Sequence, residues 1–119
     1  MKGSYIFGKE IKMSEDRKLI SKAFEIFMKD APQHAGAWNS LVQDLSAANA
    51  LDPKTAALAY LAVLAALGLD SGVPFHVRSA KDAGASREEV ISAILVGLPA
   101  AGHGVTRALP AAVEAFDKE

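Results

Sequence analysis

The sequence predicts an all-α fold, a single-domain bundle of about six helices with short connections. Three observations lead to this prediction. Apolar residues recur at helical spacing along most of the 119-residue chain. Serine, aspartate, proline and glycine stand where helices begin or end. No convincing strand pattern follows residue 13. A chain of this length fits one domain.

Residues 1–13 are expected to form an N-terminal extension, separate from a helical domain over residues 14–119. The extension reads as irregular or loosely strand-like around Tyr5 and Ile6. Two interpretations stay open: an arm that packs on a neighbouring subunit, or a frayed end.

Ser14 is the predicted N-cap of the first helix, which should stop near Asp30 because the following Ala31-Pro32 pair disfavours helix. The second helix is predicted over residues 32–48, with Trp38 in the core or at an interface. The apolar stripe of the first helix consists of Leu19, Ile20, Ala23, Phe24 and Phe27. That of the second consists of Ala37, Trp38, Leu41, Val42 and Leu45.

The third helix has the clearest signals. Asp52 is the predicted N-cap, Pro53 takes the first helical position, and the helix should run to about Leu67 and end at Gly68. Its sequence is apolar on nearly every face, which predicts a central position. The apolar run is too short for a membrane span, which needs about 20 residues.

Three further helices complete the bundle. Pro74 opens the fourth, with Gly84 as its terminator, and a capping box of Ser86 and Glu89 opens the fifth. The last helix covers about residues 105–116, and Pro110 either kinks it or marks a later start. A turn or broken helix is expected over 99–104. The fifth helix should bury Val90, Ile91, Ile94, Leu95 and Leu98.

Composition excludes several classes of function. Lys and Arg total 13 against 14 Asp and Glu, without a basic block, so nucleic-acid binding is not expected. The absence of cysteine excludes disulfides, thiolate nucleophiles and Cys-ligated metals. No signal-peptide pattern is visible in Met1–Met13, so a soluble cytoplasmic protein is the expectation.

His76 is the leading candidate for catalysis. It follows the apolar third helix and stands just past Pro74, near a helix start, where the helix dipole favours a neutral imidazole. A neutral imidazole suits a general base. The alternative is a core histidine that bonds to a backbone carbonyl. His34 should be exposed, and the three histidines lack metal-ligand spacing, so no metal site is predicted.

Five other polar residues are of types that contact substrates. Arg78 and Arg107 suit an anionic ligand or, alternatively, surface or inter-subunit salt bridges. Flanking glycines let a ligand approach His103, but they also fit an ordinary loop. Asp70 either orients His76 or caps the following turn. Tyr60, the one polar group on the third helix, is expected to point into a pocket. The substrate-binding candidates are therefore Arg78, His103, Asp70 and Tyr60.

An ordered set of segments resembles the carboxymuconolactone decarboxylase and alkyl hydroperoxidase D family. The segments are Leu51–Thr55, the apolar helix up to Gly68, Phe75–Ala80, Ala83–Val90 and Gly97–Ala101. The resemblance covers roughly residues 35–116. It implies an alkyl hydroperoxidase D-like helical fold and assembly into homo-oligomers, trimers or hexamers; the alanine-rich helices agree with burial between subunits.

In the hydroperoxidase-like branch of that family, two cysteines and a glutamate work with the histidine. The corresponding positions here hold Leu69, Gly72 and Ala57. Thiol peroxidase (peroxiredoxin) activity is therefore not expected, because that mechanism needs the sulfurs.

The decarboxylase branch lacks the cysteine pair, and His76–Ala80 matches its segment. The resemblance implies a lactone substrate that carries carboxylates, with Arg78 as an anchor and His76 as the proton-transferring group. We expect a cysteine-less family member without a cofactor. It would bind a small anionic organic molecule, with carboxy-lyase or isomerase chemistry if it is active. The alternative is a non-catalytic binding or scaffold protein descended from the family.

Overall fold

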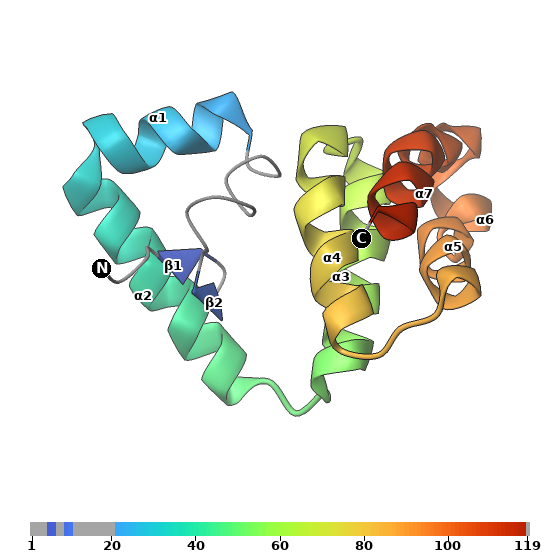
Figure 1. The fold of residues 1–119 in the computed structure, drawn as a ribbon, viewed down its shortest axis with the longest axis horizontal. Helices are drawn as coiled ribbons and strands as arrows, with labels where there is room; N and C mark the ends of the chain where they lie inside the picture. The colour runs from blue at the N-terminus through green and yellow to red at the C-terminus, as the bar shows by residue number, and fades with distance from the viewer. Residues whose placement is uncertain (1–4, 7–8, 11–20, 119) are drawn as a thin grey trace. The chain divides into compact units, whose positions relative to one another are not determined.

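The computed structural model describes residues 5–6, 9–10 and 21–118, and contacts divide the chain into two compact units, Met1–Ala50 and Leu51–Glu119 (Figure 1). The all-α fold class is confirmed. In the described ranges six helices have nine or more residues each. The two strands have only two residues each.

The first unit contains a short hairpin and two helices. Strand β1 (Tyr5–Ile6) pairs antiparallel with β2 (Lys9–Glu10), which agrees with the strand-like character expected there. Helix α1 covers Lys22–Asp30 and α2 covers Pro32–Ala48. The predicted bounds of the second helix are therefore confirmed.

The predicted start of the first helix is corrected. The helix that carries Phe24 begins at Lys22, because Ser21 has an extended backbone and its hydroxyl accepts a hydrogen bond from the Phe24 N–H at 3.2 Å. Ser21 is therefore the N-cap of this helix. The predicted cap Ser14 and the stripe residues Leu19 and Ile20 lie outside the described residues.

Three aromatic rings connect α1 and α2. The Phe24 ring meets those of Phe27 and Trp38 edge to face, with centroids 5.7 and 6.4 Å apart. Trp38 nevertheless keeps 37% of its surface exposed. It is not a core residue, which corrects one of the two predicted placements, and its burial at an interface stays a prediction.

The second unit is arranged around helix α3 (Pro53–Leu67), whose predicted bounds are confirmed. The Asp52 carboxylate caps it by accepting hydrogen bonds from the Thr55 N–H at 3.3 Å and hydroxyl at 2.6 Å. These bonds lower the pKa of Asp52. Gly68 ends the helix at φ 71°, a left-handed conformation that favours glycine.

Helix α4 (Val73–Asp82) returns beside α3 after the 3-10 turn η2 (Asp70–Gly72) (Figure 1). Helix α5 (Arg87–Leu95) and the 3-10 segment η3 (His103–Ala108) also pack on α3, while α7 (Leu109–Asp117) packs on α4 and α5. The fully buried large side chains are Leu61, Val73, Val77, Val90, Ile94 and Val105.

Two boundaries in the second half differ from the prediction. Helix α5 ends at Leu95, so Leu98 starts the one-turn helix α6 (Leu98–Ala101) and is exposed rather than buried. Helix α7 begins at Leu109 with Pro110 in its first turn, so a later start is correct and a kink is not. Proline fits there because the N–H groups of the first turn have no acceptor within the helix, so the missing N–H removes no hydrogen bond.

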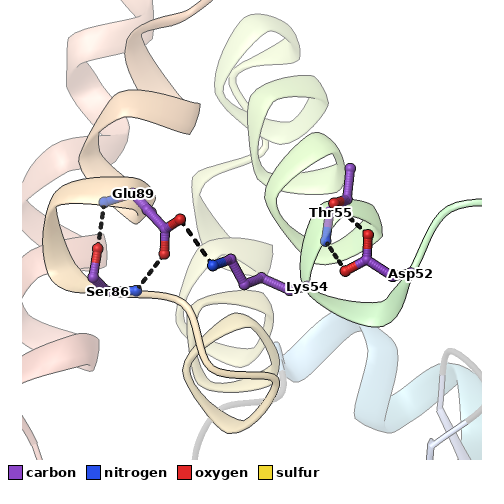
Figure 2. Close-up of polar contacts among 5 residues, drawn as sticks. All are labelled: Asp52, Lys54, Thr55, Ser86 and Glu89. Carbon is purple, nitrogen blue, oxygen red and sulfur yellow. Dashed lines mark hydrogen bonds and ion pairs between the residues drawn. The ribbon is translucent and has the colours of Figure 1, made fainter.

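The predicted capping box is present and is linked to α3 (Figure 2). The Ser86 hydroxyl accepts from the Glu89 N–H at 3.1 Å, and the Glu89 carboxylate accepts from the Ser86 N–H at 2.9 Å. The other Glu89 oxygen meets Lys54 Nζ at 2.9 Å. One carboxylate thus caps α5 and ties its start to the start of α3.

The C-terminal helix is held by two cations. Lys81 Nζ donates to the carbonyl of Phe116 at 2.7 Å and lies 4.7 Å from the centre of its ring. The Arg87 guanidinium pairs with both Asp117 oxygens, at 2.9 and 3.3 Å. Positive charge at the end of a helix satisfies its last carbonyls and its dipole.

Two leucines of α3 provide a matched test of the core. Leu61 is 0% exposed and Leu67 is 66% exposed. Leu61→Ala should lower the free energy of unfolding by about 2–5 kcal/mol, because it leaves a cavity. Leu67→Ala should change it by less than about 1 kcal/mol. Urea denaturation of both variants measures this, and equal losses would contradict the assigned core.

Glu89 predicts a specific acid sensitivity. Its hydrogen bonds from Ser86, followed by those from Lys54, lower its pKa below the ordinary 4.5. Its stabilising contribution is therefore complete above 4.5 and is lost as the pH falls through the lowered value. In Glu89→Gln this part of the pH dependence should disappear, because the amide accepts a hydrogen bond but does not titrate. Thermal melting between neutral and acid pH measures it, and parallel curves for the two proteins would refute the assignment.

Candidate functional site

His76 lies in the first part of α4 and is only 6% exposed. Its neighbour Val77 belongs, with Val73 and Ala80, to the fully buried stripe of α4, spaced at helical intervals. That stripe packs in the core of the second unit. The packing therefore brings His76 in beside the core, although the imidazole is not an apolar group.

Two aromatic rings contact the imidazole. The Tyr60 ring, from α3, stacks on it with centroids 4.2 Å apart and planes inclined by 22°. The Phe75 ring meets it edge to face, with centroids 5.3 Å apart and planes at 72°. Burial also raises the pKa of the Tyr60 phenol, so at neutral pH that hydroxyl is a neutral donor. The structure thus brings together two predicted site residues, His76 and Tyr60.

Arg78 follows His76 by two residues on α4 and is half-buried. Two residues advance a helix by more than half a turn, so Arg78 leaves α4 in a different direction from His76. The structure therefore places this candidate anchor near the imidazole along the chain but on another face of the helix.

Asp70 takes neither of its two expected roles. Its carboxylate meets the Arg107 guanidinium at 3.4 Å, which joins η2 to η3. The contacts that the structure describes for Asp70 include no cap of its own turn and no bond to His76. Arg107 itself is exposed, so its charge is only partly offset by Asp70.

The other two histidines are both exposed. His34 lies on α2, and His103 begins η3. The His103 carbonyl accepts a hydrogen bond from the Thr106 hydroxyl at 2.9 Å, which supports the 3-10 turn. Among residues 21–118 and the two short strands, no group of three His, Asp or Glu side chains is arranged to hold a metal ion.

Ala57, Leu69 and Gly72, the three positions that the resemblance implied for redox residues, carry no reactive group. Ala57 packs against the core, and Leu69 is exposed between the end of α3 and η2. Gly72 lies against Leu64, whose methyl groups would be 3.5 Å from a Cβ at that position. His76 is thus the titratable residue that remains beside these three positions, and the rings of Tyr60 and Phe75 contact it.

Sequence reasoning missed the role of Phe75 and the stacking of Tyr60 on His76. The signal for Phe75 was its adjacency to His76 in the chain. The Tyr60 contact had no local signal, because it depends on how α3 packs against α4.

Across the described part of the chain, no helix has both the length and the apolar character that crossing a bilayer requires. Searches of curated proteins and of solved structures each gave no match. The model of the carboxymuconolactone decarboxylase family, in contrast, matches residues 32–117. That range runs from the start of α2 to the end of α7 and contains the whole His76 site. The chain therefore belongs to the carboxymuconolactone decarboxylase family.

Proposed function

We propose that the protein binds a small anionic organic molecule beside His76 and that His76 transfers a proton to or from it. The observation that supports this most directly is the buried imidazole in contact with the rings of Tyr60 and Phe75. Buried titratable groups are frequent at active sites.

The chemistry available to this site is acid–base chemistry. An imidazole that gains or loses a proton near neutral pH suits decarboxylation of an activated acid or isomerisation of a lactone. Both reactions form or consume a carbanion-like centre next to a carbonyl group. The imidazole is only 6% exposed beside the rings of Tyr60 and Phe75, and low exposure to water strengthens the electrostatic interactions of a bound ion.

Two arginines support an anionic substrate. Arg78 is on the same helix as His76, and Arg107 offers an exposed guanidinium with one long contact to Asp70. A guanidinium binds a carboxylate through two parallel hydrogen bonds. We propose Arg78 as the main anchor for a carboxylate at a distance from the reacting atoms, because Arg78 and His76 leave α4 on different faces. Tyr60 is the proposed neutral hydroxyl donor. His103 and Asp70 are proposed to contact the bound molecule farther from His76.

A non-catalytic binding or scaffold role is the second candidate. It is favoured by the inert side chains at Ala57, Leu69 and Gly72. It is also favoured by the exposed apolar residues Val63 and Leu67 on α3, which a subunit contact would cover. The proposed homo-oligomer, a trimer or hexamer, is compatible with either function. Peroxide reduction by thiols is not proposed, because the chain has no cysteine.

The test is turnover of lactones that carry carboxylates and of β-keto acids by the wild type and two variants. His76→Ala and His76→Gln should each lower kcat/KM by about 10²–10⁴-fold, the usual contribution of a general acid or base. His34→Ala is the matched control, because this histidine is exposed and lies on α2; activity should persist in it.

Full activity in both His76 variants would remove the proposed mechanism. Binding of a carboxylate ligand that depends on Arg78, without turnover of any tested substrate, would instead support the binding role.

A further inference from the structure

The side of α3 that lies opposite its buried leucines is apolar and exposed. Val63 is 53% exposed and Leu67 is 66% exposed. Ala59 and Ala66 lie on the same side of the helix and are exposed as well. Residues 55–69 include no charged side chain, whereas the solvent face of a surface helix normally carries charges. An uncharged apolar face of this kind indicates a surface that another protein chain covers.

The order of small and large side chains on this face fits a second copy of the same helix. Ala59 and Leu67 each stand four residues from Val63. In an antiparallel pair with its two-fold axis at Val63, Ala59 therefore lies opposite Leu67 of the partner subunit, and the same contact occurs again on the other side of the axis. A methyl group against a large side chain lets the two helices approach closely.

The charges at the two ends of the face are complementary in the same arrangement. Asp52 has an exposed carboxylate at the start of α3, on the other side of the helix from Lys54 (Figure 2). Beyond the end of α3, the Arg107 side chain is 71% exposed, and its partner Asp70 is only 34% exposed. An antiparallel pair brings the start of one α3 to the end of the other, so Asp52 comes near the guanidinium of the partner subunit's Arg107.

We propose that α3 pairs with α3 of a second copy of this chain, antiparallel and about a two-fold axis at Val63. The pairing rests on the proposed homo-oligomer, whose contact surface it names, but not on the reaction proposed for His76. A two-fold pair occurs in a dimer and in a hexamer made of three such pairs, whereas a three-fold trimer contains none. The pairing therefore favours a dimer or a hexamer over a trimer.

The absence of cysteine permits a direct test, because a single introduced thiol can form a disulfide only with its copy in a second chain. Val63→Cys places two thiols at the two-fold axis, where the Cα atoms come within the distance of about 7 Å that a disulfide requires. Val96 is the matched control, since it is an exposed valine at the end of α5. Under mild oxidation of micromolar protein, Val63→Cys should form a covalent dimer roughly tenfold faster than Val96→Cys. Non-reducing electrophoresis follows both rates.

Light scattering after size-exclusion chromatography tests the same surface without oxidation. The wild type should elute as a dimer or a hexamer. Val63→Lys places two positive charges at the axis and should halve the number of chains in the assembly, because the like charges repel. Val96→Lys adds the same charge at another exposed valine and should leave the assembly unchanged. Circular dichroism checks that each variant keeps its helices.

Asp52→Asn tests the charges at the ends of the face. Asparagine is as good an N-cap as aspartate, so the start of α3 is kept while the charge is removed. The dissociation constant of the pair should rise roughly twofold to tenfold at low salt, because an exposed ion pair is lost at both ends, and the effect should fade at high salt. Glu88→Gln removes an exposed acid from the first turn of α5 and is the control. Analytical ultracentrifugation measures both constants.

Three results would overturn the pairing. One is a monomeric or trimeric wild type. Another is equal cross-linking of Val63→Cys and Val96→Cys. The third is a wild-type assembly in Val63→Lys. An oligomer that persists while Val63→Cys cross-links slowly removes the pairing but leaves the proposed homo-oligomer, so the two fail distinguishably. Loss of turnover in the His76 variants bears on neither.

Discussion

The second unit depends on the burial of one face of α3. Leu61, Leu64 and Ala65 stand three and four residues apart, so they form a single stripe, and α4, α5 and η3 all contact this helix. Burial of apolar side chains is the main favourable term in folding. The polar contacts reinforce the same arrangement, since Glu89 joins the starts of α3 and α5 through Lys54. This exposed ion pair between Lys54 and Glu89 contributes less to stability than the buried leucines do.

The same packing creates the candidate site. Tyr60 directly precedes the buried Leu61 on α3, and His76 directly precedes the buried Val77 on α4. When Leu61 and Val77 enter the core, their neighbours meet at its edge as a stacked pair. A helix that is apolar on all sides can therefore support both a core and a site, because its exposed side carries the one tyrosine that reaches the imidazole.

The parts of the fold that were predictable from sequence are those with local signals. The bounds of α3 follow from Asp52, Pro53 and Gly68, and the capping box follows from Ser86 and Glu89, because caps act over three or four residues. No such signal marks the end of α5, and apolar periodicity alone predicted a helix that continues to Leu98, whereas α5 ends at Leu95. In the candidate site, the chain context of His76 predicted a catalytic role, which stays a prediction, and the burial of its side chain is observed. The contacts of His76 with Tyr60 and of Asp70 with Arg107 were not predicted. Each contact joins two elements that are far apart in sequence, so it depends on tertiary packing.

The central claim is that α3 is the element on which the second unit and its site are built. Native-state amide hydrogen exchange tests it directly, because residues of the shared core exchange only when the whole unit unfolds. The amides of Leu61–Ala65 should be among the most protected in the unit, together with those of Val77–Ala80 on α4, and should exchange with the free energy of global unfolding. The account would be contradicted if the amides of Leu61–Ala65 exchanged through a local opening of lower free energy than global unfolding while α4 and α7 stayed protected.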